Sequence, residues 1–229
     1  MWFDDVPGRS WTRLWSGYVL CGGGCPAIRK ITEACPACEA PAYDLTPTTE
    51  VIDGRKITLN PTFMGAEGRY EDYIYLQMLQ REWERPASEF EHFANVPDAS
   101  RPSARAALVL LFWGYFETRI ERLFRVALRS LPPRILESQL KRHSGIGSRL
   151  YEFYKIAFDT NYFDDLTAHG FHAVACLLKD IHQRRNEFTH GAPQNINDAT
   201  VEALVTCLRD EHEAWITVFN SRVRSGPTV

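Results

Sequence analysis

The segment from Arg185 to His190 carries side chains that suit acid–base chemistry beside a bound phosphate. A guanidinium such as that of Arg185 holds phosphate oxygens and stabilises the negative charge that develops on them. The imidazole of His190 can transfer protons near neutral pH. Asn186 lies four residues before His190, so a helix would present its amide on the same face. His182 extends this face by one turn, but we expect it to be exposed.

The spacing of Arg and His decides nothing by itself, because residues 85–92 show it too in a chain with seven histidines. A proline crosses that first match, whereas the second lies at the end of an apolar helical stripe. Arg185 falls on this stripe, which consists of Phe171, Val174, Leu178, Ile181 and Phe188. Gly191 is a helix-stop signal and places His190 at the helix C-terminus.

An arginine on a buried stripe needs a partner, because an uncompensated buried charge is very costly. Glu117 is a candidate, since an earlier helix places it on an apolar stripe with Trp113, Ile120 and Phe124. Glu121, one turn later, would repel it. We therefore expect Arg185 and Glu117 to pair, either within a functional site or as a purely structural ion pair. Arg184 lies off the stripe and should contact phosphate or be a solvated charge.

Four cysteines near the N-terminus form two pairs with the spacing of metal-binding knuckles. Cys21 and Cys25 flank three glycines, and Cys35 and Cys38 flank Pro-Ala. Four thiolates from two tight turns satisfy tetrahedral Zn(II), and a region this poor in core residues needs such a crosslink. We predict a structural zinc ribbon, with redox-active or unrelated free thiols as alternatives; a catalytic zinc would need an open position. The remaining cysteines, each alone within a helix, are predicted to be core residues: Cys176 and Cys207.

The elements that must position these residues are mostly helices. Helical patterns cover roughly residues 69–93 with a break at Pro86, 103–131 with Ser103 as N-cap, 134–142, 147–158, 171–189 and 197–221. The earlier chain is rich in turn-formers, and residues 50–59 predict a hairpin around Asp53-Gly54. The sequence changes from turn-formers to helical periodicity near residues 62–68. The predicted fold is therefore mainly α, a helical bundle at 67–229 with a small zinc-ribbon and β-hairpin region at 1–66.

Composition limits the classes of function. The chain has 229 residues, 45% of them hydrophobic, and a net charge of −3, which is typical of an ordinary globular protein rather than a generally basic nucleic-acid coat. Its start is acidic without a signal-peptide pattern, and no stretch of membrane-span length is free of charge, so we expect a cytoplasmic protein without membrane contact. Most basic residues are Arg, which fits RNA contact but also follows from GC-rich coding sequence.

Two helices together resemble a known family. The helix with Phe112-Trp113-Gly114-Tyr115-Phe116-Glu117 and the later helix ending in Arg185-Asn186-x-x-x-His190 resemble the HEPN superfamily over roughly residues 68–222. The zinc ribbon lies outside this resemblance. The family implies a helical HEPN-like domain that forms a homodimer, in which two Arg-x(4–6)-His motifs face one cleft. Its active members cut RNA without a metal through the ribose 2′-hydroxyl, leaving a 2′,3′-cyclic phosphate and a 5′-hydroxyl.

The function that this resemblance implies is a metal-independent RNA endonuclease, acting as a toxin or as an antiviral, abortive-infection effector on tRNA or another cellular RNA. His190 would move protons at the 2′-hydroxyl or the leaving oxygen, and Arg185 would hold the scissile phosphate. Asn186 would orient the phosphate or the imidazole, Glu117 would fix Arg185, and Arg184 would bind substrate. The zinc would be structural, and catalysis would need no cofactor. An antitoxin or regulatory protein is a candidate partner.

Two alternatives stay open. One is a catalytically inactive HEPN-like binding module that partners a nucleotidyltransferase or another defence component. The other is an unrelated helical protein whose zinc ribbon mediates assembly. The combination of Arg, Asn and His favours the enzyme, because a pure scaffold has no need of that set.

Overall fold

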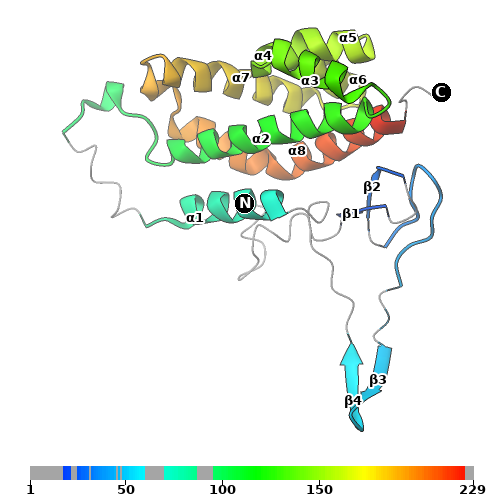
Figure 1. Cartoon of the computed structure of the whole chain (residues 1–229). Coiled ribbons are helices and arrows are strands. Elements are labelled where there is room, and N and C mark those ends of the chain that lie inside the picture. Colours follow the sequence, from blue (N-terminus) through cyan, green and yellow to red (C-terminus); the bar gives the residue numbers. More distant parts are fainter. Residues whose placement is uncertain are drawn as a thin grey trace.

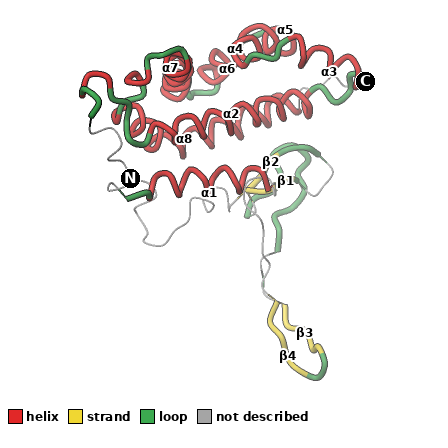
Figure 2. The backbone as a smooth tube through the Cα atoms, turned by 60° about the vertical axis from the view of Figure 1, so that its left-hand side comes forward, coloured by secondary structure: helices red, strands yellow, loops and turns green. Residues whose placement is uncertain are grey.

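The computed structural model describes residues 18–21, 25–30, 32–44, 46, 48–59, 70–86 and 95–224. This part of the chain is mainly helical, as predicted, and four helices form its frame: α1 (Tyr70–Glu84), α2 (Ala106–Ala127), α7 (His172–Thr189) and α8 (Asp198–Arg224). Helices α2 and α8 pack side by side, with α1 below and α7 above them in Figure 1. Figure 2 looks almost along α7 while α2 runs across the view, so α7 crosses the others steeply.

Helix α2 is the centre of the core, because apolar residues cover more than one of its faces. Its fully buried side chains include Phe112, Trp113, Phe116, Ile120 and Phe124. The helix begins at Ala106, three residues later than the predicted start, and its N-cap is Arg105 rather than Ser103. The hydroxyl of Ser103 accepts the N–H of Arg105 at 3.1 Å, and the N–H of Ser103 donates to the carbonyl of Ile196 at 2.7 Å, which ties the start of α2 to the start of α8.

The segment between α2 and α7 consists of short helices: α3 (Pro133–Arg142), α4 (Ile146–Ser148), the π-helical turn η5 (Arg149–Phe153), α5 (Tyr154–Phe158) and α6 (Tyr162–Ala168). The predicted helices at 134–142 and 147–158 are confirmed, but α6 was not predicted. Its N-cap signal was visible in the sequence, because Asn161 accepts hydrogen bonds from the amides of Phe163 and Asp164. The buried carboxylate of Asp165 then accepts bonds from Arg222, which fixes α6 to α8.

The predicted helices at 171–189 and 197–221 are confirmed, and α8 continues to Arg224. Helix α1 ends at Glu84, two residues before the proline that was expected to break it, and residues 87–94 lie outside the described part. Two 3-10 turns connect the frame, η4 (Asp98–Ser100) before α2 and η6 (Pro193–Asn195) before α8. None of the described helices combines the length and apolar character that a membrane span requires.

The N-terminal region contributes two antiparallel strand pairs. Strand β1 (Tyr18–Leu20) pairs with β2 (Ile28–Lys30), and β2 docks on α8. The amide of Asn220 bonds both the N–H and the carbonyl of Ile28, at 2.8 and 2.7 Å, and the side chain of Ile28 is buried in the main core. The predicted change of pattern at 62–68 falls outside the described residues.

The predicted hairpin is confirmed as β3 (Thr48–Ile52) and β4 (Arg55–Leu59). Asp53 and Gly54 form its turn with φ values of 52° and 75°. Two successive positive φ angles define the tight turn whose twist matches a hairpin, and Asp-Gly is a preferred pair for it. The hairpin projects away from the helices in Figures 1 and 2.

Candidate functional site

The C-terminus of α7 has the geometry that Gly191 predicted. The N–H of Ala192 donates to the carbonyl of Glu187 at 2.9 Å, and Gly191 adopts a left-handed φ of 101°. This hydrogen-bond pattern ends a helix and fixes the residue before the glycine at the C-cap. His190 occupies that position and is exposed. Among the described residues, no side chain or backbone group bonds its ring, so the imidazole is accessible to a substrate.

Arg185 and Glu117 pair as predicted. The guanidinium Nη2 of Arg185 lies 3.7 Å from Oε1 of Glu117, and its Nη1 donates to Oδ1 of Asn186 at 3.1 Å. The expected burial is wrong, because the two charged side chains are 33% and 35% exposed. The apolar stripe of α7 is buried only as far as Ile181, and Phe188 at its end is only partly covered. The polar cluster of Arg185, Asn186, Glu117 and His190 therefore lies at the surface, beyond the crossing of the helices.

Glu121, which was expected to repel Glu117, is itself paired with two arginines. Its carboxylate pairs with Arg125 at 2.8 Å and with Arg149 at 3.1 Å. Burial raises the pKa of Glu121, but the bond from Arg125 and the charge of Arg149 outweigh burial and lower it below the usual value. The two arginines thus neutralise much of the repulsion that Glu121 would exert on Glu117.

His182 is half-buried rather than exposed. Its ring stacks flat on the indole of Trp113, with centroids 5.1 Å apart and an interplanar angle of 4°. On another side it meets Gly147, where a Cβ atom would lie 3.4 Å from Cε1 of His182. Burial and the nearby charge of Arg185 lower the pKa of this imidazole. The spacing of four residues between His182 and Asn186 predicted that both lie on the polar face. It could not predict the contacts of His182 with Trp113 and Gly147.

Arg184 faces a different neighbour from Arg185. Its Nε donates to Asp180 at 2.7 Å and its Nη1 donates to the carbonyl of Asn195 at 3.0 Å. These bonds attach α7 to η6. A phosphate that bound Arg184, as the sequence predicts, would have to compete with both acceptors.

The four cysteines of the predicted knuckles converge on one point. Their sulfur atoms all lie within 4.8 Å of one another, and two pairs, Cys21–Cys38 and Cys25–Cys35, are 3.5 Å apart. A tetrahedron of thiolates around Zn(II), with Zn–S bonds near 2.3 Å, has sulfurs about 3.8 Å apart. The cluster therefore has the size and the donor set of a metal site.

Local amides favour a thiolate in this cluster. The N–H of Ala37 points at Sγ of Cys35 from 3.4 Å. Burial raises the pKa of Cys35, but the amides of Ala37 and Cys38 and the neighbouring thiols outweigh burial and lower it to about 6. Hydrogen bonds from backbone amides to the sulfur stabilise its negative charge. The thiolate that they favour is the form of cysteine that binds a metal.

The two other cysteines differ from each other. Cys207 is partly buried and packs against the core, close to the expectation, and burial raises its pKa to about 11. Cys176 was also expected in the core but is exposed. The reason is its place on α7: the buried stripe passes through Val174 and Leu178, and Cys176 lies between them on the outer face.

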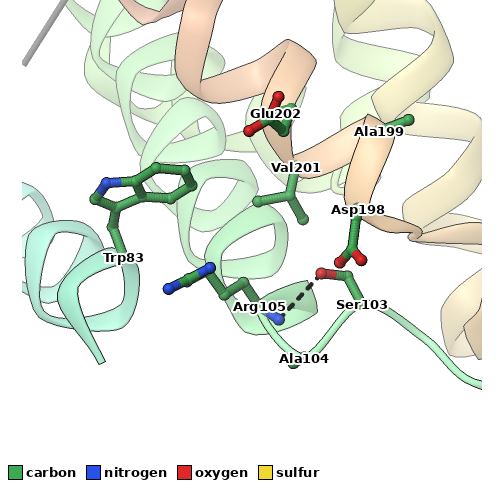
Figure 3. Close-up of a pocket in the computed structure, with 8 residues that line it drawn as sticks. All are labelled: Trp83, Ser103, Ala104, Arg105, Asp198, Ala199, Val201 and Glu202. Carbon is green, nitrogen blue, oxygen red and sulfur yellow. Dashed lines mark hydrogen bonds between the residues drawn. The ribbon is translucent and has the colours of Figure 1, made fainter. Parts of the chain in front are cut away.

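A cavity of about 600 Å³ opens where α1 ends and α2 and α8 begin. Figure 3 shows Arg105 reaching toward Trp83, with Asp198 and Glu202 of α8 on the opposite wall. The guanidinium carbon of Arg105 lies 5.0 Å from the centroid of the Trp83 ring. The lining contains none of the residues that the sequence predicts to be functional, so this cavity is separate from the cluster around Arg185.

The described chain thus holds two groups of chemically active side chains. One is the surface cluster of Arg185, Asn186, Glu117 and His190, and the other is the four-cysteine cluster. Comparison with family models, with curated proteins and with solved structures finds no match for the chain.

Proposed function

We propose that the protein is a metal-independent RNA endonuclease of HEPN type, a toxin or antiviral effector, and that Arg185 and His190 form its active site. The observation that carries the proposal is the arrangement of Arg185, whose guanidinium is held between Asn186 and Glu117, five residues before an accessible imidazole. The same helix end thus carries an anion-binding group and a proton-transfer group.

A purely structural role explains this arrangement poorly. An ion pair as exposed as Arg185–Glu117 contributes only about 0–1 kcal/mol to stability. Its value lies rather in orientation, because the carboxylate and the amide together fix the plane of the guanidinium. A guanidinium has five N–H donors, and the contacts of Arg185 with Asn186 and Glu117 involve only its Nη atoms, so donors remain for phosphate oxygens.

The chemistry would use the RNA itself as the source of the nucleophile. The 2′-hydroxyl attacks the adjacent phosphorus, Arg185 stabilises the charge that develops on the phosphate oxygens, and His190 transfers a proton at the reacting oxygens. Dependence on the 2′-hydroxyl makes the reaction specific for RNA. A homodimer would bring two such motifs into one cleft.

The test is to incubate the purified full chain with total RNA in the presence of EDTA and to identify the ends of the products. We expect cleavage that leaves 2′,3′-cyclic phosphate and 5′-hydroxyl ends, and a dimer by light scattering. The zinc content of the same sample distinguishes loss of a structural zinc from loss of a catalytic metal. If EDTA abolishes cleavage while zinc is retained, the metal-free mechanism is wrong. If no RNA is cut at all, a binding module becomes the better explanation.

We also propose that Cys21, Cys25, Cys35 and Cys38 hold one structural Zn(II) ion. The spacing of their sulfurs supports this, and the docking of β2 on α8 gives the ion a role in attaching the N-terminal region. Four thiolates leave no open position for water, so the ion would stabilise the fold and take no part in the cleavage step.

Replacement of Cys35 by Ser tests the zinc site. We expect the zinc content to fall from about one ion per chain to none, because a structural zinc needs all four ligands. The midpoint of thermal unfolding should fall by about 2–4 °C for each kcal/mol that is lost. The matched control is Cys176→Ser, since Cys176 is exposed and distant in sequence from the cluster. Full zinc content in Cys35→Ser, or an equal loss in the control, would refute the site.

A further inference from the structure

We propose that His182 is a second catalytic residue of the same site, the one that accepts the proton of the 2′-hydroxyl, while His190 protonates the leaving oxygen. The inference rests on the proposed function and assigns separate roles to two imidazoles of one helix, a proton acceptor and a proton donor. It starts from the way in which the ring of His182 is held.

The ring of His182 is fixed by contacts that leave its nitrogens free. The indole of Trp113, itself buried, supports one face of the imidazole, and Gly147 lets the backbone of α4 approach its Cε1 edge. Within the described ranges, neither ring nitrogen has a hydrogen-bond partner. This orientation by stacking leaves both nitrogens for a substrate.

The surroundings of His182 favour a proton acceptor. On its own helix it faces the charge of Arg185, and burial and this charge hold its pKa below the ordinary value. From α2 it meets the neutral ring of Trp113, with Glu117 beyond it already paired to Arg185, and from α4 it meets Gly147. The imidazole is therefore mostly neutral at pH 7. His190 instead lies at the exposed C-cap of the same helix, where its ring is open to solvent.

The order of the residues along α7 fits an in-line reaction. Displacement at phosphorus needs the attacking and leaving oxygens on opposite sides of the phosphate. His182 precedes Arg185 by three residues and His190 follows it by five, so the two imidazoles lie on opposite sides of the guanidinium. Their Cα atoms are about 12 Å apart along an ideal helix. The side chains of His182 and His190 can span this distance if both reach toward a phosphate that Arg185 holds between them.

The step is balanced without any further reactant. A ring nitrogen of neutral His182 takes the proton of the 2′-hydroxyl as the 2′-oxygen forms a bond to phosphorus. The bond between phosphorus and the 5′-oxygen breaks, and this oxygen takes a proton from the imidazolium of His190. The products are a 2′,3′-cyclic phosphate and a 5′-hydroxyl. Exchange with water restores the protonation state of both rings.

The experiment compares the pH dependence of kcat/KM for RNA cleavage in wild type, His182→Phe and His182→Gln. Phe retains the stack on Trp113 but has no nitrogen. We expect either variant to lower kcat/KM by about 10²–10⁴-fold and to lose its fall at low pH, because that limb reports protonation of the base. His172→Gln is the matched control, an exposed histidine at the start of the same helix, and should behave as wild type.

Gly147→Ala provides a second control that changes no titratable group. Its Cβ would lie 3.4 Å from Cε1 of His182, an ordinary van der Waals contact that leaves the ring in place, so we expect kcat/KM to stay within about threefold of wild type. NMR titration gives a readout besides activity: His182 should titrate below its ordinary value and shift upward in Arg185→Gln. Cleavage by His182→Phe within threefold of wild type, with the low-pH limb retained, would overturn the inference alone. An inactive wild type would overturn the proposed function as well.

Discussion

Replacement of His190 by Ala is expected to lower the rate of RNA cleavage by about 10²–10⁴-fold, the usual contribution of a positioned acid or base. Its ring is exposed and makes no hydrogen bond to any described residue, so the free energy of unfolding should stay within about 0.5 kcal/mol of the wild-type value. The two measurements together separate chemistry from folding. A variant that loses activity without losing stability identifies a residue that acts on the substrate.

The control for this variant is His172→Ala, which removes another exposed imidazole from the same helix. It should cut RNA at the wild-type rate, because it lies at the start of α7, more than three turns before Arg185. Equal activity of His190→Ala and wild type would show that the cleavage has another source. Loss of dimerisation in His190→Ala would instead assign the histidine to the interface.

Features of the site that depend on local sequence were predictable. The helix stop at Gly191 depends on residues within one turn, and the sulfur cluster depends on the fixed spacing of two cysteine pairs. The pairing of Arg185 with Glu117 was also predictable, because each lies on an apolar stripe and carries opposite charge. Its exposure was not, since the steep crossing of α7 decides where the stripe leaves the core.

Features that depend on contacts between distant segments were not predictable. The contacts that hold His182 come from Trp113 and Gly147, each of which lies more than thirty residues from it along the sequence. Periodicity assigns a residue to a face of its helix but does not say which neighbour covers that face. The same limit applies to the charged pair at the centre of the bundle, which no local pattern indicated.

That pair joins Arg119 of α2 to Glu211 of α8, with Nη2 and Oε1 at 2.5 Å. Arg119 is fully buried, and its guanidinium carbon lies 4.3 Å from the ring centroid of Tyr115 and 5.2 Å from that of Trp215. Burial opposes the charge of Arg119, but Glu211 and Tyr115 outweigh burial and raise its pKa further. Burial also raises the pKa of the Glu211 carboxyl, and the charge and hydrogen bond of Arg119 only partly oppose this shift, so the carboxylate depends on its partner.

We expect Arg119→Met to lower the free energy of unfolding by about 3–5 kcal/mol, because it leaves the carboxylate of Glu211 buried without its partner. Chemical denaturation measures this directly. The control is Arg125→Met on the same helix, whose ion pairs with Glu121 and Glu137 are partly exposed and should contribute about 1 kcal/mol or less.

The double variant Arg119→Met, Glu211→Leu separates the cost of an orphaned charge from the worth of the pair. Within the described part, Nε and Nη1 of Arg119 and Oε2 of Glu211 are buried without hydrogen-bond partners, so the wild-type pair already carries unsatisfied polar atoms. We therefore expect the double variant to recover to within about 1 kcal/mol of wild type, or to exceed it. If it is as unstable as Arg119→Met, the aromatic contacts of the guanidinium contribute more than its bond to Glu211 does. Recovery would mean that the pair adds little net stability, because the cost of burying two charges offsets their attraction.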